Sequence, residues 1–160
     1  MRKLLQLSGM LLLTAVSFGQ DSLRGSVTPE RAWWNVTKYD ITVEADAATK
    51  SIAGENVMTF IALADGNTMQ IDLQQPMRLD KASLQSDTAA IRLERKKNVY
   101  YLHLNKPVIK GSTVTLVLKF SGSPHEAVTP PWDGGWIWRT DRQGNPWMSV
   151  ACQGLGASVW

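Results

Sequence analysis

The sequence predicts an all-β protein, and more closely an antiparallel β-sandwich that follows an N-terminal signal peptide. Apolar residues recur at every second position in short bursts between residues 33 and 120, as expected of half-buried strands. Turn-forming residues separate the bursts, and no stretch of ten or more residues beyond the N-terminal segment has helical periodicity. The 160 residues are enough for one such domain.

The first two expected strands lie close together in the chain. Tyr39, Ile41 and Val43 alternate with polar residues, which predicts a strand that is buried on one face. A second strand is expected over residues 55–61, after a turn at Ala53–Gly54.

Four further segments complete the sandwich pattern. Alternation predicts strands around residues 69–73 and 91–93. A charged turn at 94–97, expected to be solvated, leads into a strand over 99–104. The segment 113–120 has the strongest strand pattern, because β-branched and apolar residues dominate it.

The N-terminal segment is typical of an exported protein. A basic start precedes an apolar run over residues 4–16, and small residues follow up to Gly19, where we expect cleavage of a signal peptide (1–19). A leader (20–32) and the sandwich (33–160) would then remain. The apolar run is shorter than the ~20 residues that a stable membrane span needs. We therefore expect a periplasmic or extracellular protein.

Composition excludes several classes of function. The net charge is +3, and the charges are dispersed rather than gathered in a basic stripe, which argues against a nucleic-acid partner. The single cysteine, Cys152, excludes an internal disulfide and a multi-cysteine metal cluster.

The last third of the chain is rich in tryptophan. A loop with several prolines and glycines spans 121–131, and a hairpin of 136–139 with 147–151 is expected after it. Four tryptophans lie in this region: Trp132, Trp136, Trp138 and Trp147. They could form an interface with another domain, a platform for a sugar or peptide, or local packing, and the sequence leaves these three interpretations open.

Other motifs predict no chemistry. The segment from His125 begins like the zinc motif H-E-x-x-H, but Thr129 replaces the second histidine and Pro130–Pro131 forbids a continuing helix. His103 alternates with apolar residues and is expected to be a partly buried strand residue. Cys152 has no histidine near it in the sequence, so a thiol enzyme is the weakest hypothesis. We expect no catalytic and no metal-binding residue in this chain.

The C-terminal motifs resemble a known family. Residues 131–136, the turn 141–147 and the segment 147–154 are similar to the end of the N-terminal domain in zinc aminopeptidases of peptidase family M1, the aminopeptidase N and leukotriene hydrolase group. The upstream strands fit the same domain, so the resemblance covers about residues 28–160.

This resemblance implies a saddle-like sandwich that flanks a catalytic domain of the same polypeptide. The position of Gln153 matches the family residue that holds the free α-amino group of a peptide. Many members have glutamate there, whereas a glutamine brings no formal charge. As an alternative, the Gln153 amide caps a neighbouring loop.

The remaining family motifs do not occur in this chain. These are H-E-x-x-H with its downstream glutamate, the catalytic tyrosine and G-x-M-E-N. We therefore expect the substrate-flanking domain of an exported zinc aminopeptidase, inactive alone, with zinc only in the full-length enzyme and the catalytic domain absent. The alternative is a separate secreted sandwich that binds carbohydrate or peptide through Trp132, Trp136 and Trp138.

Overall fold

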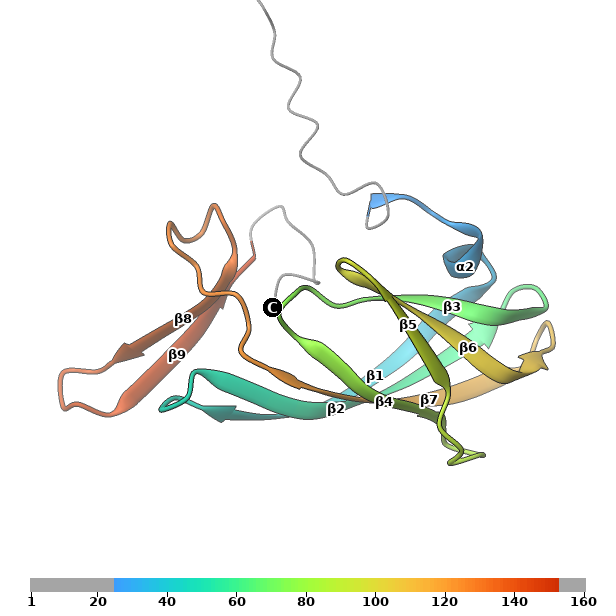
Figure 1. The fold of residues 1–160 in the computed structure, drawn as a ribbon, viewed down its shortest axis with the longest axis horizontal. Coiled ribbons are helices and arrows are strands. Elements are labelled where there is room, and N and C mark those ends of the chain that lie inside the picture. Colours follow the sequence, from blue (N-terminus) through green and yellow to red (C-terminus); the bar gives the residue numbers. More distant parts are fainter. Residues whose placement is uncertain (1–24, 153–160) are drawn as a thin grey trace, which may run out of the picture.

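The structure, a computed structural model, describes residues 25–152, which form strands joined by turns and one short helix. The elements are α2 (Pro29–Ala32), β1 (Trp34–Asp46), β2 (Ser51–Ala62), β3 (Gly66–Asp72), β4 (Arg78–Leu84), β5 (Arg92–Lys96), β6 (Val99–Val108), β7 (Thr113–Gly122), β8 (Gly135–Thr140) and β9 (Pro146–Ala151). They build a four-stranded sheet in the order β1-β2-β7-β4, a three-stranded sheet in the order β3-β6-β5, and the β8-β9 hairpin (Figure 1). Every one of these pairings is antiparallel, so the predicted all-β sandwich is confirmed.

The four-stranded sheet has an apolar face and a polar face because its strands pair in a fixed register. Met58 of β2 lies opposite both Tyr39 of β1 and Leu116 of β7, so these three side chains share one face. The other face carries Thr59 opposite Thr115, whose hydroxyl oxygens lie 3.2 Å apart in a hydrogen bond. We call the apolar side the inner face, since the three-stranded sheet packs against it.

The main core lies between the inner face and the three-stranded sheet. Both sheets contribute its most buried side chains, which are Met58, Phe60, Met69, Leu102 and Leu116. Trp33 and Trp34 meet the ring of Phe60 edge-on, with centroids 5.9 and 6.0 Å apart. Full burial of such side chains stabilises the fold by roughly 1.5–3 kcal/mol each, so this cluster is the main source of stability.

A second, smaller core joins the β8-β9 hairpin to the sandwich. Ile52 of β2 and Met77, which precedes β4, are buried with Trp136 and Trp138 of β8. Phe120 of β7 packs against the same cluster. The hairpin lies beside the end of the sandwich away from α2, at the left of Figure 1.

One expected turn is part of a strand. Ala53 and Gly54 lie within β2, and the chain reverses earlier, in the turn that follows Asp46. A glycine is needed at position 54 because a Cβ there would lie 2.2 Å from the Thr42 carbonyl oxygen and 2.8 Å from the Phe120 ring. The expectation of a turn at Ala53–Gly54 is therefore wrong.

Strand β4 was not among the expected strands, and its register explains why. Leu79 and Ala82 both face the core although they are three positions apart. An irregularity in the pairing with β7 between Leu79 and Lys81 shifts the alternation by one residue. The period-two pattern is therefore broken in the sequence.

The first strand is present as predicted, but half of it is not buried. Trp34 and Val36 pack against the main core, whereas Tyr39, Ile41 and Val43 are 54, 51 and 43% exposed. These three residues lie on the inner face, beyond the part that the three-stranded sheet covers. The expectation of a half-buried strand is wrong for this part of β1.

Candidate functional site

The four tryptophans lie in one unit, formed by the loop 123–134 and the β8-β9 hairpin, which we call the tryptophan unit (residues 123–151). The two strands pair from Gly135 opposite Ala151 to Thr140 opposite Pro146, which confirms the predicted hairpin. Its strands direct alternate side chains to two faces, so the tryptophans on β8 and β9 need not share a role.

The hairpin turn is closed by one carboxylate. Asp141 Oδ1 accepts hydrogen bonds from the backbone N–H groups of Gln143 (2.9 Å) and Asn145 (2.8 Å), and Asp141 Oδ2 accepts one from Asn145 Nδ2 (3.0 Å). Gly144 has φ +87°, a conformation that glycine adopts without strain. The Asn145 side chain, and after it the backbone N–H groups, hold the pKa of the Asp141 carboxyl below its usual value.

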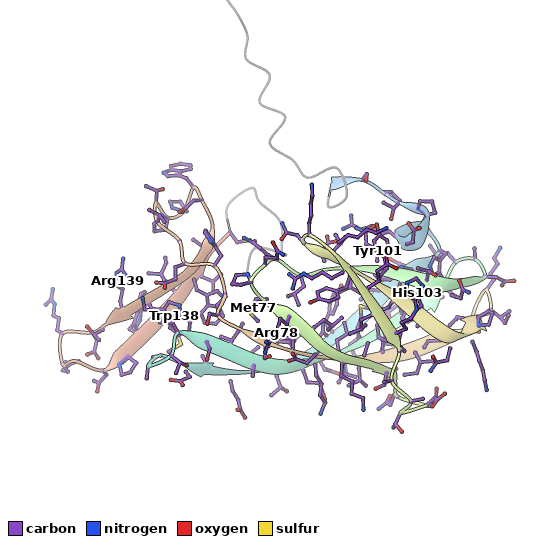
Figure 2. All side chains as sticks on the ribbon, in the orientation of Figure 1. Met77, Arg78, Tyr101, His103, Trp138 and Arg139 are labelled. Carbon is purple, nitrogen blue, oxygen red and sulfur yellow. The ribbon has the colours of Figure 1, made fainter. Side chains whose placement is uncertain are left out.

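Two of the four tryptophans are part of the second core. Trp136 and Trp138 are 8 and 6% exposed, and their rings stack with centroids 5.0 Å apart at an interplanar angle of 21°. Figure 2 shows Trp138 on the side of the hairpin that faces the sandwich. Of the three interpretations that the sequence leaves open, local packing describes this pair, because the two rings attach the hairpin to the sandwich.

The other two tryptophans are exposed. Trp147 of β9 is 53% exposed and lies opposite Arg139, on the hairpin face away from Trp136 and Trp138. Trp132 of the loop is 70% exposed. These two residues are what remains of the predicted interface or ligand face.

The loop before the hairpin is tied to it through the backbone. The N–H of Ala127 donates to the carbonyl of Trp136 at 2.9 Å, and the N–H of Trp136 donates to the carbonyl of His125 at 2.7 Å. Lys50 Nζ pairs with Glu126 Oε2 at 2.9 Å and so connects the β1-β2 turn to this loop. The loop therefore holds a defined position beside β8.

Asp133 shapes the part of the loop that carries Trp132. Its Oδ2 atom accepts hydrogen bonds from the backbone N–H groups of Thr129 and Val128. The Thr129 hydrogen bond is the main reason that the pKa of the Asp133 carboxyl lies below its usual value. The N–H of Trp132 in turn donates to the Thr129 carbonyl at 3.0 Å.

The described residues do not fit a zinc site. His125 and Glu126 lie in the loop rather than on a helix, and the Glu126 carboxylate is paired with Lys50. Between residues 25 and 152 no three His, Cys, Asp or Glu side chains lie together as metal ligands would.

His103 has the environment that the sequence predicts. It lies on β6, is about a quarter exposed, and its Nε2 atom is 3.3 Å from Glu94 Oε2. His103, followed by Lys96, lowers the pKa of the Glu94 carboxyl. Cys152 is half-buried, directly after β9.

The segment 94–97, expected to be a charged turn, is mostly strand, because β5 continues to Lys96 and the turn follows at Lys97. Arg95 is half-buried, and its guanidinium donates to the carbonyls of Met77 (2.7 Å) and Leu73 (3.3 Å) and to the Tyr100 hydroxyl (2.9 Å). The expectation of a solvated turn is wrong here, because Arg95 supplies donors to backbone groups of the loop between β3 and β4. No feature of the sequence distinguishes this arginine from its charged neighbours.

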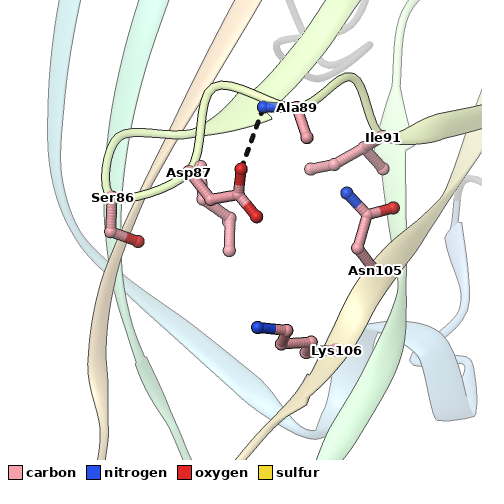
Figure 3. Close-up of a pocket in the computed structure, with 7 residues that line it drawn as sticks. Ser86, Asp87, Ala89, Ile91, Asn105 and Lys106 are labelled. Carbon is pink, nitrogen blue, oxygen red and sulfur yellow. Dashed lines mark hydrogen bonds between the residues drawn. The ribbon is translucent and has the colours of Figure 1, made fainter.

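A hollow of about 330 Å³ lies near the β4-β5 connection (Figure 3). Its lining residues are Leu84, Ser86, Asp87, Ala89, Ile91, Asn105 and Lys106. The Asp87 carboxylate already accepts a hydrogen bond from the Ala89 N–H at 3.0 Å. Asp87 and Lys106 are the charged residues among these described lining residues.

Gln153, the residue that the family resemblance singles out, lies outside the described residues. Strand β9 ends at Ala151, two positions before it. In the same described part of the chain, no helix is both long and apolar enough to cross a membrane.

Solved structures of similar fold include M1 zinc metallopeptidases and LTA4 hydrolase. The chain is similar to yeast LTA4 hydrolase in complex with bestatin, with a TM-score of 0.59, 14% identity, and coverage of 79% of this chain and 20% of that one. It is also similar to an M1 zinc metallopeptidase of Deinococcus radiodurans bound to a Tyr-Ser-Ala substrate, with a TM-score of 0.55, 18% identity, and coverage of 72% and 28%. A two-domain M1 zinc metallopeptidase bound to L-arginine gives a TM-score of 0.55 at 20% identity, with the same coverage.

These similarities establish the fold. The described chain has the sandwich fold of the N-terminal domain in M1 zinc metallopeptidases, and it spans between a fifth and somewhat more than a quarter of the length of those proteins. No protein-family model matches the chain, and no curated protein sequence matches it.

Proposed function

We propose that this chain is the substrate-flanking N-terminal domain of an exported, zinc-dependent aminopeptidase of the M1 type. The fold is the observation that supports this proposal, because the similarity to these solved structures covers most of the chain. In this proposal the catalytic domain belongs to the same polypeptide and supplies the zinc ligands and the general base. The chain by itself hydrolyses no peptide.

Gln153 is the proposed contact of the substrate. The β8-β9 hairpin is fixed to the sandwich through the second core, and β9 ends two positions before this residue in the sequence. The glutamine carbonyl would accept a hydrogen bond from the α-ammonium group of a peptide. A hydrogen bond to a charged group contributes about 1.5–3 kcal/mol, which is enough to select a free N-terminus.

The first experiment is to determine the coding sequence beyond the Trp160 codon. We expect the frame to continue to G-x-M-E-N and H-E-x-x-H. In that longer protein, Gln153→Ala should lower kcat/KM for an aminoacyl chromogenic substrate by about ten- to a hundredfold. Gln143→Ala, in the exposed hairpin turn, is the matched control and should leave kcat/KM unchanged.

A stop codon after Trp160 in a stable secreted protein would contradict the proposal and favour the second candidate. The exposed indoles of Trp132 and Trp147 support that candidate, which is a sandwich that binds carbohydrate or peptide. Saturable quenching of tryptophan fluorescence by an oligosaccharide or peptide, lost in Trp132→Ala, would then establish it.

A further inference from the structure

The free edge of β1 has two properties that favour pairing with another strand. β1 has 13 residues and lies at the margin of the four-stranded sheet, and no strand within residues 25–152 pairs with its other edge. Tyr39, Ile41 and Val43 are exposed on the inner face beside that edge. Unpaired backbone N–H and C=O groups next to exposed apolar side chains are a template for a further strand.

The polar face of the same segment carries charges of both signs. Lys38 and Asp40 are exposed and form an ion pair at 2.7 Å within the strand. Glu44 is exposed further along, on the same face. The lysine and this glutamate are therefore placed symmetrically about Ile41, three residues to either side.

We propose that two copies of this chain pair antiparallel through the free edges of β1, with Ile41 opposite Ile41 on the twofold axis. Tyr39 of one copy then lies opposite Val43 of the other, an aromatic and β-branched pair of the kind that stabilises sheets. On the polar face Lys38 lies opposite Glu44, and the symmetry forms this ion pair twice. The pairing joins the two four-stranded sheets into one continuous sheet.

Neighbouring registers are less favourable. A shift by one residue sets the apolar row of one copy against the polar row of the other. An axis at Asp40 places that carboxylate opposite itself, and an axis at Thr42 places it opposite Glu44. An axis at Val43 places Asp40 opposite Asp46, and all three registers therefore bring like charges together, which destabilises a sheet. The bulge near the start of β1 ends the regular ladder on the other side.

Charge reversal tests the pairing and its register in the full chain. Lys38→Glu sets two carboxylates opposite each other at each of these pairs, and Glu44→Lys sets two ammonium groups opposite each other. We expect each variant alone to dissociate about tenfold more readily than the wild-type dimer, as measured by sedimentation equilibrium. An equimolar mixture of the two variants should form a heterodimer. In it each residue at position 38 faces a residue of opposite charge at position 44 of the other copy.

The mixture separates pairing from misfolding, since unfolded variants would not recover by mixing. Lys110→Glu, in the exposed β6-β7 turn, makes the same change of charge and should leave the dimer intact. A wild-type chain that is monomeric at every concentration would overturn the proposal. Dimers that are unaffected by either single variant, or variants that do not recover in the mixture, would also overturn it.

Discussion

Arg95 illustrates how one side chain can connect three segments of this fold. Its guanidinium reaches carbonyls of the β3-β4 loop through Leu73 and Met77, and the Tyr100 hydroxyl of β6, while its Nε atom donates to the Lys97 carbonyl at 2.8 Å. The planar guanidinium presents five donors in a fixed geometry, which an ammonium group cannot reproduce.

Replacement of this arginine should weaken the whole domain. We expect Arg95→Met to lower the free energy of unfolding by about 2–3 kcal/mol, because several half-buried acceptors lose a charged donor. Arg92→Met, on the same strand but two-thirds exposed, should change it by less than about 0.5 kcal/mol. Urea titration of both variants measures the difference, and equal effects would show that Arg95 acts only as a surface charge.

Asp141 should make the stability of the hairpin depend on pH. The Asn145 side chain lowers the pKa of this carboxyl in the folded state, so the folded protein binds fewer protons than the unfolded chain near that pKa. The resulting stability is present above the unfolded value of about 3.9 and is lost as the pH falls through the folded value.

The variant Asp141→Asn should therefore melt below the wild type near neutral pH, and the two melting temperatures should converge as the pH falls below about 4. Circular dichroism melting curves across this range test the expectation. Asp80→Asn, on the exposed part of β4, removes the same charge and serves as the control. A difference for Asp141→Asn that stayed constant with pH would show that its carboxylate is not the stabilising group.

At the scale of elements, the β8-β9 hairpin depends on a contact outside itself. An isolated two-stranded hairpin is at best marginally stable in water. Here Trp136 and Trp138 stack and pack against Ile52 and Met77, so the sandwich supplies the missing apolar surface. Trp147, on the other face, takes no part in this core.

This difference between faces predicts the effects of two substitutions. Trp138→Ala should lower the free energy of unfolding by about 3–5 kcal/mol, since it removes a large buried ring. Trp147→Ala should cost less than about 1 kcal/mol, because its ring is 53% exposed. Trp138→Phe should cost less than the alanine variant, since it retains a ring and removes an indole N–H that has no hydrogen-bond partner among the described residues. Urea titration measures all three, and comparable losses for Trp138→Ala and Trp147→Ala would contradict the placement of the second core.

At the scale of the whole molecule, residues 25–152 form two cores of unequal size on one inner face. The larger core lies under the three-stranded sheet, and the smaller core lies under the hairpin. The middle of β1 lies outside both, which leaves its apolar side chains exposed. The two proposals are tested by different measurements, sedimentation equilibrium for the pairing of two β1 edges and kcat/KM for the role beside a catalytic domain.

The sequence by itself determined the strands with regular alternation and the hairpin with its turn. It did so because period two and turn chemistry are local properties, as in 113–120 and in the turn at Asp141. Its family motifs also indicated the fold that the solved structures share.

Only the tertiary structure decided which apolar residues are buried. Tyr39 and Trp138 look equally suited to a core in the sequence. The sandwich covers Trp138, whereas no packed element covers Tyr39 among the described residues, and it stays exposed. The bulge in β4 and the structural role of Arg95 likewise depend on strands distant in the sequence. Burial is a property of the assembled layers, and alternation fixes only the face toward which a side chain points.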